Sequence, residues 1–81
     1  MNRTEAILFI KKIQTICEAI SPTAVKLTEP NPNNTFSIGY QISISGFFDN
    51  DWLEKIKEIA KKDGLSVTVG NGEVIIYKPK N

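Results

Sequence analysis

The sequence of 81 residues contains no histidine and a single cysteine, Cys17. Without histidine, the chain lacks the commonest general base and the commonest metal ligand of proteins. Cys17 cannot form a disulfide within the chain, so nothing calls for an oxidising compartment. It also falls on the apolar stripe of a predicted helix, where core packing is a better interpretation than a nucleophile. We therefore expect a protein that is not an enzyme and needs no metal or other cofactor.

Long apolar runs and a dominant charge are also missing. The apolar run at residues 6–10 is too short for a signal-peptide core or a membrane span, which predicts a cytoplasmic chain without a membrane partner. The net charge is +1, which argues against a nucleic-acid backbone as the main partner. A composition with 12 Ile, 9 Lys and 7 Asn indicates an AT-rich genome. At this length we expect one small domain, residues 1–81.

One stretch, residues 36–45, alternates without interruption between apolar and small polar residues. The apolar residues fall at even positions and include Ile42, while the odd positions hold serine, glycine and glutamine. A period of two over ten residues predicts a strand with one buried face. A register slip by one residue would expose the apolar side chains, so the strand should pair in one register.

The rest of the chain predicts two helices and three further strands. The first helix begins at Asn2, in a capping box with Glu5, and ends ahead of Pro22. The second begins with either Asp49 or Asp51 as its cap and ends at Gly64. The apolar residues of each helix share one face. The three further strands are residues 23–29, 65–69 and 73–78.

The order of elements, αββαββ, predicts an α+β fold with two helices on one face of a four-stranded antiparallel sheet. The last strand is apolar on both faces at residues 74–77, as expected of a central strand. If the second helix makes a right-handed crossover that skips one strand, the sheet order is 3-4-2-1. That order is a circular permutation of the ferredoxin-like arrangement. The alternative order is 1-2-3-4.

Two charged clusters invite functional interpretations that we consider weaker than structural ones. Asp49 and Asp51, with Glu54 one turn later, contain the ligand types of a divalent-ion or acid/base site. Their place at a predicted helix N-terminus fits capping and the helix dipole better. The lysines of the second helix alternate with Glu54 and Glu58, as on a solvated, ion-paired face; they are Lys55, Lys57, Lys61 and Lys62.

The sheet face away from the helices is the best candidate for a contact surface. The long strand should direct uncharged polar residues to it, among them Ser37, Gln41 and Ser43. With a two-residue turn at Asn71-Gly72, the last strand adds Ile75 and Tyr77; with a three-residue turn it adds Val74 and Ile76 instead. An apolar centre with a neutral polar rim is typical of protein-binding surfaces. The alternative is that a loop or the C-terminal tail covers this face.

These observations predict a non-catalytic domain that binds a protein partner or self-associates as a homodimer through this face. The small size and the AT-rich bias would fit an inhibitor or accessory protein from a mobile element. The alternative is weak RNA binding by Tyr77 with Lys26 and Lys78, since RNA-binding sheets stack bases on aromatic side chains flanked by basic residues. Because the net charge is low, nucleic acid is the less favoured partner. A small enzyme ranks third, for want of catalytic groups.

Overall fold

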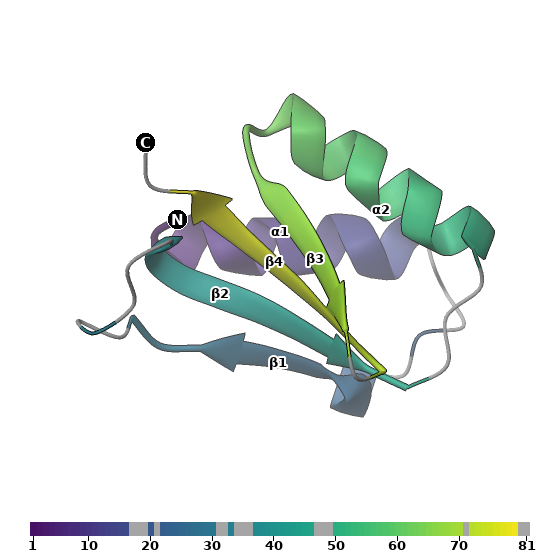
Figure 1. Ribbon diagram of the computed structural model, residues 1–81, viewed down its shortest axis with the longest axis horizontal. Helices are drawn as coiled ribbons and strands as arrows, with labels where there is room; N and C mark the ends of the chain where they lie inside the picture. The colour runs from purple at the N-terminus through teal and green to yellow at the C-terminus, as the bar shows by residue number, and fades with distance from the viewer. Residues whose placement is uncertain are drawn as a thin grey trace.

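The computed structural model describes residues 1–16, 20, 22–30, 33, 37–46, 50–70 and 72–79. It contains the predicted succession αββαββ, with one short 3₁₀ helix added before the first strand (Figure 1). The α+β class is therefore confirmed. The elements are α1 (Arg3–Ile16), η1 (Pro22–Ala24), β1 (Val25–Thr28), β2 (Ser37–Ser45), α2 (Asn50–Lys62), β3 (Ser66–Gly70) and β4 (Glu73–Pro79).

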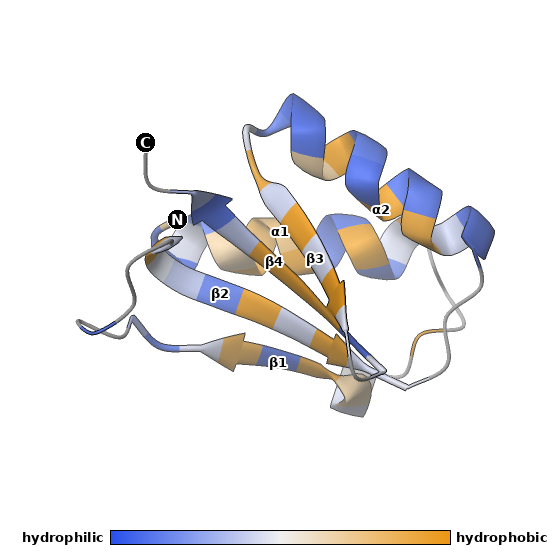
Figure 2. Cartoon of the chain, in the orientation of Figure 1, coloured by the Kyte–Doolittle hydropathy of each residue, from blue (hydrophilic) through white to orange (hydrophobic). Residues whose placement is uncertain are grey.

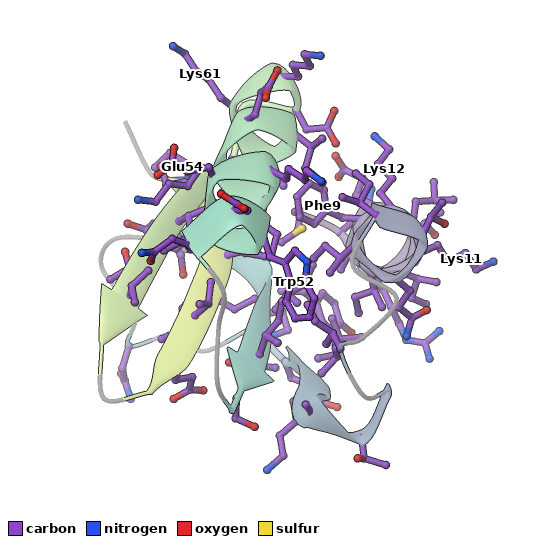
Figure 3. The ribbon with its side chains drawn as sticks, turned by 90° about the vertical axis from the view of Figure 1, so that its right-hand side faces the viewer. Phe9, Lys11, Lys12, Trp52, Glu54 and Lys61 are labelled. Atoms are coloured by element: carbon purple, nitrogen blue, oxygen red, sulfur yellow. The ribbon has the colours of Figure 1, made fainter. Side chains whose placement is uncertain are left out.

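The four strands form one antiparallel sheet in the order β1-β2-β4-β3. This is the predicted order 3-4-2-1, and the alternative 1-2-3-4 is wrong. The chain leaves β2 through α2 and returns as β3, which pairs with β4, so the crossover skips one strand. Both helices pack on the same side of the sheet, where their buried residues form one cluster with those of β2 and β4. In Figure 1, α1 lies behind the sheet and α2 runs beside β3; in Figure 3, α1 lies to the right of the strands.

The core lies between the helices and the two central strands. Ile42 of β2 is paired with Ile76 of β4, and Ile44 with Val74, and all four side chains are fully buried. The helices bury the apolar faces that their spacing predicts, and Figure 2 shows the hydrophobic residues of α2 turned to the sheet and the hydrophilic ones outward. The buried helix residues are Ala6, Phe9, Ile13, Ile56 and Ala60.

Two helix ends form as the sequence predicts. At the start of α1, the Glu5 backbone N–H donates to Asn2 Oδ1 at 2.8 Å, and the Asn2 N–H donates to Glu5 Oε1 at 3.0 Å. At the end of α2, Gly64 has φ 73°, and the Leu65 N–H donates to the Ala60 carbonyl at 2.8 Å. That bond, from the third residue beyond Lys62 back to the last turn of the helix, is the Schellman pattern that glycine favours.

The other two ends differ from the prediction. The described part of α1 reaches Ile16, and Ile20 lies in a bend from which it still reaches the core, so the helix ends before Ile20. Ile16, an apolar residue of this helix, is 38% exposed. Helix α2 begins at Asn50, so Asp51 lies inside its first turn and is not the cap. Asp49 and Cys17 lie outside the described residues.

The alternation of β2 breaks at Gly39, which the sequence did not predict. Gly39 has φ 73°, and the pairing of β2 with β4 shifts register between Ile38 and Ile42. Next to this irregularity, Ser37 is 5% exposed and Ile38 is 48% exposed, the reverse of the prediction. The Met1 amino group donates to the Ile38 carbonyl, and the Tyr40 N–H donates to the Met1 carbonyl at 2.8 Å. The backbone at Met1 thus pairs with the distorted part of the strand.

We expect Ile42→Ala to lower the free energy of unfolding by about 2–5 kcal/mol, because it leaves a cavity in a fully buried site. Chemical denaturation measures the change. Ser43→Ala, one residue along on the opposite sheet face, is the matched control and should stay within about 0.5 kcal/mol of the wild type. A similar small effect for Ile42→Ala would contradict the assignment of the buried face.

Gly39→Ala should destabilise the fold more than Gly72→Ala does. Both glycines have positive φ, 73° and 71°, so both substitutions incur the left-handed backbone cost of about 1–2 kcal/mol. A Cβ at Gly39 would lie 2.3 Å from the Met1 carbonyl oxygen, whereas one at Gly72 meets no atom within 4 Å. Thermal or chemical denaturation of the two variants therefore isolates the contact with Met1, and equal losses would show that this contact contributes nothing.

Candidate functional site

The sheet face opposite the helices, called the open face below, contains the outward side chains of all four strands. The pairs Gly70–Glu73, Val69–Val74 and Val67–Ile76 are the register of the two-residue turn. Of the two alternatives left by the sequence, this one places Ile75 and Tyr77 outward. The open face comprises Lys26, Thr28, Gln41, Ser43, Ser45, Ser66, Thr68, Glu73, Ile75 and Tyr77.

Ile75 lies at the centre of the open face. One row of paired residues crosses the whole sheet, from Lys26 through Ser43 and Ile75 to Thr68. Tyr77 lies two residues further along β4, and the Thr68 hydroxyl donates to the Tyr77 hydroxyl at 3.4 Å. The two large side chains are therefore flanked by hydroxyl groups, and both are partly exposed. In Figure 1 no helix lies in front of β4 on this face.

Of the five predicted contact residues, four are partly exposed on this face and Ser37 is buried. The four are Gln41, Ser43, Ile75 and Tyr77, and the prediction that Ser37 is an exposed residue is wrong. Ser37 pairs with Pro79, two residues along β4 from Tyr77, so it is on the same side of the sheet but is covered. The Gln41 amide donates to the Ser37 hydroxyl at 2.7 Å, so Ser37 positions the Gln41 side chain instead.

Charge on the open face is confined to its margins. Among the described residues of this face, the charged ones are Lys26, on the edge strand β1, and Glu73, at the hairpin end of β4. Lys26 lies beside Ser43 across the strands, and Glu73 lies two residues from Ile75 along β4. Sequence reasoning considered Lys26 but missed Glu73, whose outward position follows from the turn register once that is known.

Lys78 does not join Tyr77 and Lys26, contrary to the RNA-binding alternative. It lies next to Tyr77 along β4 and so points to the other side of the sheet. Its amino group lies beside Gly64 at the C-terminal end of α2, 3.4 Å from where a Cβ would be. The carbonyl end of a helix attracts a cation, which accounts for this position. The structure thus separates the three residues that an RNA-stacking surface would need together.

The amino group of Met1 is the described group with an altered pKa. Burial lowers the pKa of this amine, Glu5 opposes the shift by favouring its charged form, and Lys78 lowers the pKa further. The amine lies at the bulge of β2, bonded to the Ile38 carbonyl. Because Met1 precedes α1 on the helix side of the sheet, this group is not part of the open face.

Helix α1 presents a second exposed apolar area around Leu8, which is 54% exposed. A shallow groove along the helix surface has Leu8, Thr15 and Ile16 among its lining residues. Lys12, which also lines it, forms a 2.9 Å ion pair with Asp63 at the end of α2. Figure 3 shows Lys11 projecting from the far side of α1, away from the sheet. An exposed ion pair of this kind adds little stability. It gives the groove a polar border but, among its described lining residues, no buried polar group that would hold a ligand firmly.

Sites of other kinds are not evident in the part of the chain that the structure describes. Within it, no three His, Cys, Asp or Glu side chains gather as metal ligands would. The described helices are too short and too polar to cross a membrane. Asp51, considered as a cation ligand, is exposed in the first turn of α2, where an acidic residue favours the helix dipole.

No model of a protein family, no curated protein and no solved structure matches this chain. Its function is therefore inferred from the geometry and chemistry of its own residues. The open face is the described surface that combines a large aromatic and a large aliphatic side chain with an uncharged polar border.

We expect nucleic-acid binding to be weak and independent of sequence. The reason is the separation of Tyr77 from Lys78, together with the alternation of lysine and glutamate on the exposed side of α2. Fluorescence anisotropy with labelled single-stranded RNA and duplex DNA at physiological salt measures the affinity. Non-specific binders have dissociation constants of about 10⁻⁴–10⁻⁶ M, so submicromolar binding would contradict this expectation.

Proposed function

We propose that this protein is a non-catalytic cytoplasmic binding domain and that its open face docks against a second copy of the chain. The observation that supports this is the register of the β3–β4 hairpin, which directs Ile75 and Tyr77 outward where neither helix covers them. The alternation of β2 adds Gln41 and Ser43 beside them, so the centre of the face carries no charge.

The energy of such a contact would come from the two large side chains. Removing a large apolar side chain from water is worth about 1.5–3 kcal/mol. Tyr77 suits the role of anchor, because its ring buries apolar area while its hydroxyl keeps the Thr68 hydroxyl as a partner. The Gln41 amide is already oriented by Ser37, which reduces the entropy lost when the face is covered.

The charges at the margins favour a second copy over a strongly charged partner. A symmetric dimer uses the same patch on both chains, so the patch must be complementary to itself. One cation, Lys26, and one anion, Glu73, at two separate margins of a neutral centre meet this requirement. A face made for an acidic or a basic partner would present one sign of charge. A small inhibitor or accessory protein from a mobile element could act through the same contact.

The area of the open face predicts weak association. Strands lie about 4.8 Å apart and rise about 3.3 Å per residue, so a sheet of this size offers roughly 300 Å² on each side of the contact. Stable interfaces bury about 800 Å² per partner. We therefore expect dimerisation by this face to need high protein concentrations.

The double variant Gln41→Lys, Ser43→Lys tests the proposal. Each protomer would then place two positive charges in the contact, and association should fall by about tenfold or more through like-charge repulsion. Both side chains point away from the core, so the monomer should keep its fold. Sedimentation equilibrium over a range of concentrations measures association, and circular dichroism checks the fold.

A control with the same added charge is Thr4→Lys, Thr23→Lys, at exposed positions of α1 and η1. It should associate as the wild type does. If the open-face variant unfolds, that face is covered within the monomer. If it folds and associates like the control, the contact lies elsewhere, with the surface around Leu8 next to be examined. Either result contradicts the proposal.

A further inference from the structure

The two edges of the sheet differ in how they are protected against pairing with another strand. The edge strand β1 has four residues, includes Lys26, and lies between Pro22 and Pro30. Short length, lysine and flanking proline are the usual protections of an edge. The other edge strand, β3, reads Ser-Val-Thr-Val-Gly. It has no charge, no proline and no bulge in its register, so it lacks these protections.

The register also identifies the free backbone groups of β3. A two-residue hairpin closes with a hydrogen-bonded pair, here Gly70–Glu73, and bonded pairs then recur at every second residue. Thr68 therefore bonds to β4, and Val67 and Val69 direct their N–H and C=O groups outward. Among the described residues, no backbone bond from outside the sheet reaches Val67 or Val69.

The side chain of Val69 is also uncovered. It pairs with the buried Val74 and so lies on the helix side of the sheet, but it is 52% exposed. The reason is that β3 is an edge strand, with β4 as its only neighbour in the sheet. A further strand at this edge would cover Val69 and pair the outward backbone groups at the same time.

We propose that β3 pairs with β3 of a second copy, antiparallel, about a twofold axis at Thr68. Val67 then lies opposite Val69 of the other protomer, and the outward N–H and C=O groups of both residues are paired. On the helix side, the half-buried Val67 covers the exposed Val69 of the other chain, and the reverse contact follows by symmetry. The two sheets become one continuous sheet.

The charges of α2 show why a second copy fits here. Figure 3 shows Glu54 and Lys61 projecting from α2 on the side of β3, away from α1. They are equally distant along the helix from the midpoint between Lys57 and Glu58. When two copies of α2 meet antiparallel, Glu54 faces Lys61 of the other copy, and Lys57 faces its Glu58. All four residues are exposed, so the pattern is complementary to itself.

One twofold axis serves both the strand and the helix. The midpoint between Lys57 and Glu58 lies about 7 Å along the helix from its end at Lys62, at about 1.5 Å per residue. Thr68 lies about 7 Å along β3 from its start at Ser66, at about 3.3 Å per residue. A tight turn joins α2 to β3, and each midpoint is about 7 Å from that turn along its own element. The two midpoints therefore lie side by side, where one twofold axis can pass both.

This contact uses the edge of the sheet and is independent of the open-face contact proposed above. The two are separated by testing the edge in the Gln41→Lys, Ser43→Lys variant, in which open-face association is weakened. That variant should still form a dimer at high concentration. In amide hydrogen exchange, Val67 and Val69 should be protected only at concentrations where the dimer forms, whereas Thr68, bonded to β4, is protected throughout. A monomer at all concentrations, or a dimer with unprotected Val67 and Val69, overturns the proposal.

Charge reversal on α2 supplies a second test. Glu54→Lys and Lys61→Glu, each alone, set like charges against each other twice in the dimer and should raise its dissociation constant about tenfold. The two substitutions together restore opposite charges, so the dissociation constant of the dimer should return to within about twofold of its value without either substitution. Lys11→Glu, on the far side of α1, changes the net charge as Lys61→Glu does and should have no effect. Single variants that behave like Lys11→Glu, or a double variant that does not recover, contradict the proposed axis.

Discussion

The pairing of β2 with β4 is the interaction on which the rest of the structure depends. Ile42 and Ile44 of one strand lie beside Ile76 and Val74 of the other, and these four fully buried side chains form the floor on which both helices pack. The same pairing determines the opposite face. Because side chains alternate along a strand, burying Ile76 directs Ile75 outward, next to Ser43. The pairing of β2 with β4 therefore determines both which residues form the core and which form the candidate contact surface.

The bulge at Gly39 limits how far that register extends. Positive φ at Gly39 lets the Met1 backbone approach β2 closely, since any side chain at this position would meet the Met1 carbonyl. The chain thereby anchors the start of α1 to the sheet. Next to this distortion, Ser37 is buried and Ile38 is exposed. Ser37 consequently acts on the open face only through its hydrogen bond with Gln41.

Two surfaces of the sheet remain available for contacts, and they differ in physical character. The open face offers side chains, with Ile75 and Tyr77 as apolar area and hydroxyl groups as their border. The β3 edge offers backbone groups, whose directional bonds would fix the geometry of a partner strand more strictly. A pairing of the β3 edges would place two open faces side by side in one larger sheet. A single open face is smaller than a stable interface, and this arrangement would join two of them into a larger contact surface.

Local chemistry in the sequence determined the element order, the capping box of Asn2 with Glu5, the end of α2 at Gly64, and the inward faces of Ile42 and Ile44. These features depend on side-chain spacing, chain handedness and backbone conformations that neighbouring residues specify. Only the tertiary structure decided between the two hairpin registers and placed Lys78 beside Gly64. It also made Ser37 buried and Ile38 exposed, the reverse of what the alternation predicts. Periodicity shows that a strand has two unlike faces. Which residues are covered depends on contacts such as that of Met1 with β2, between residues far apart in the chain.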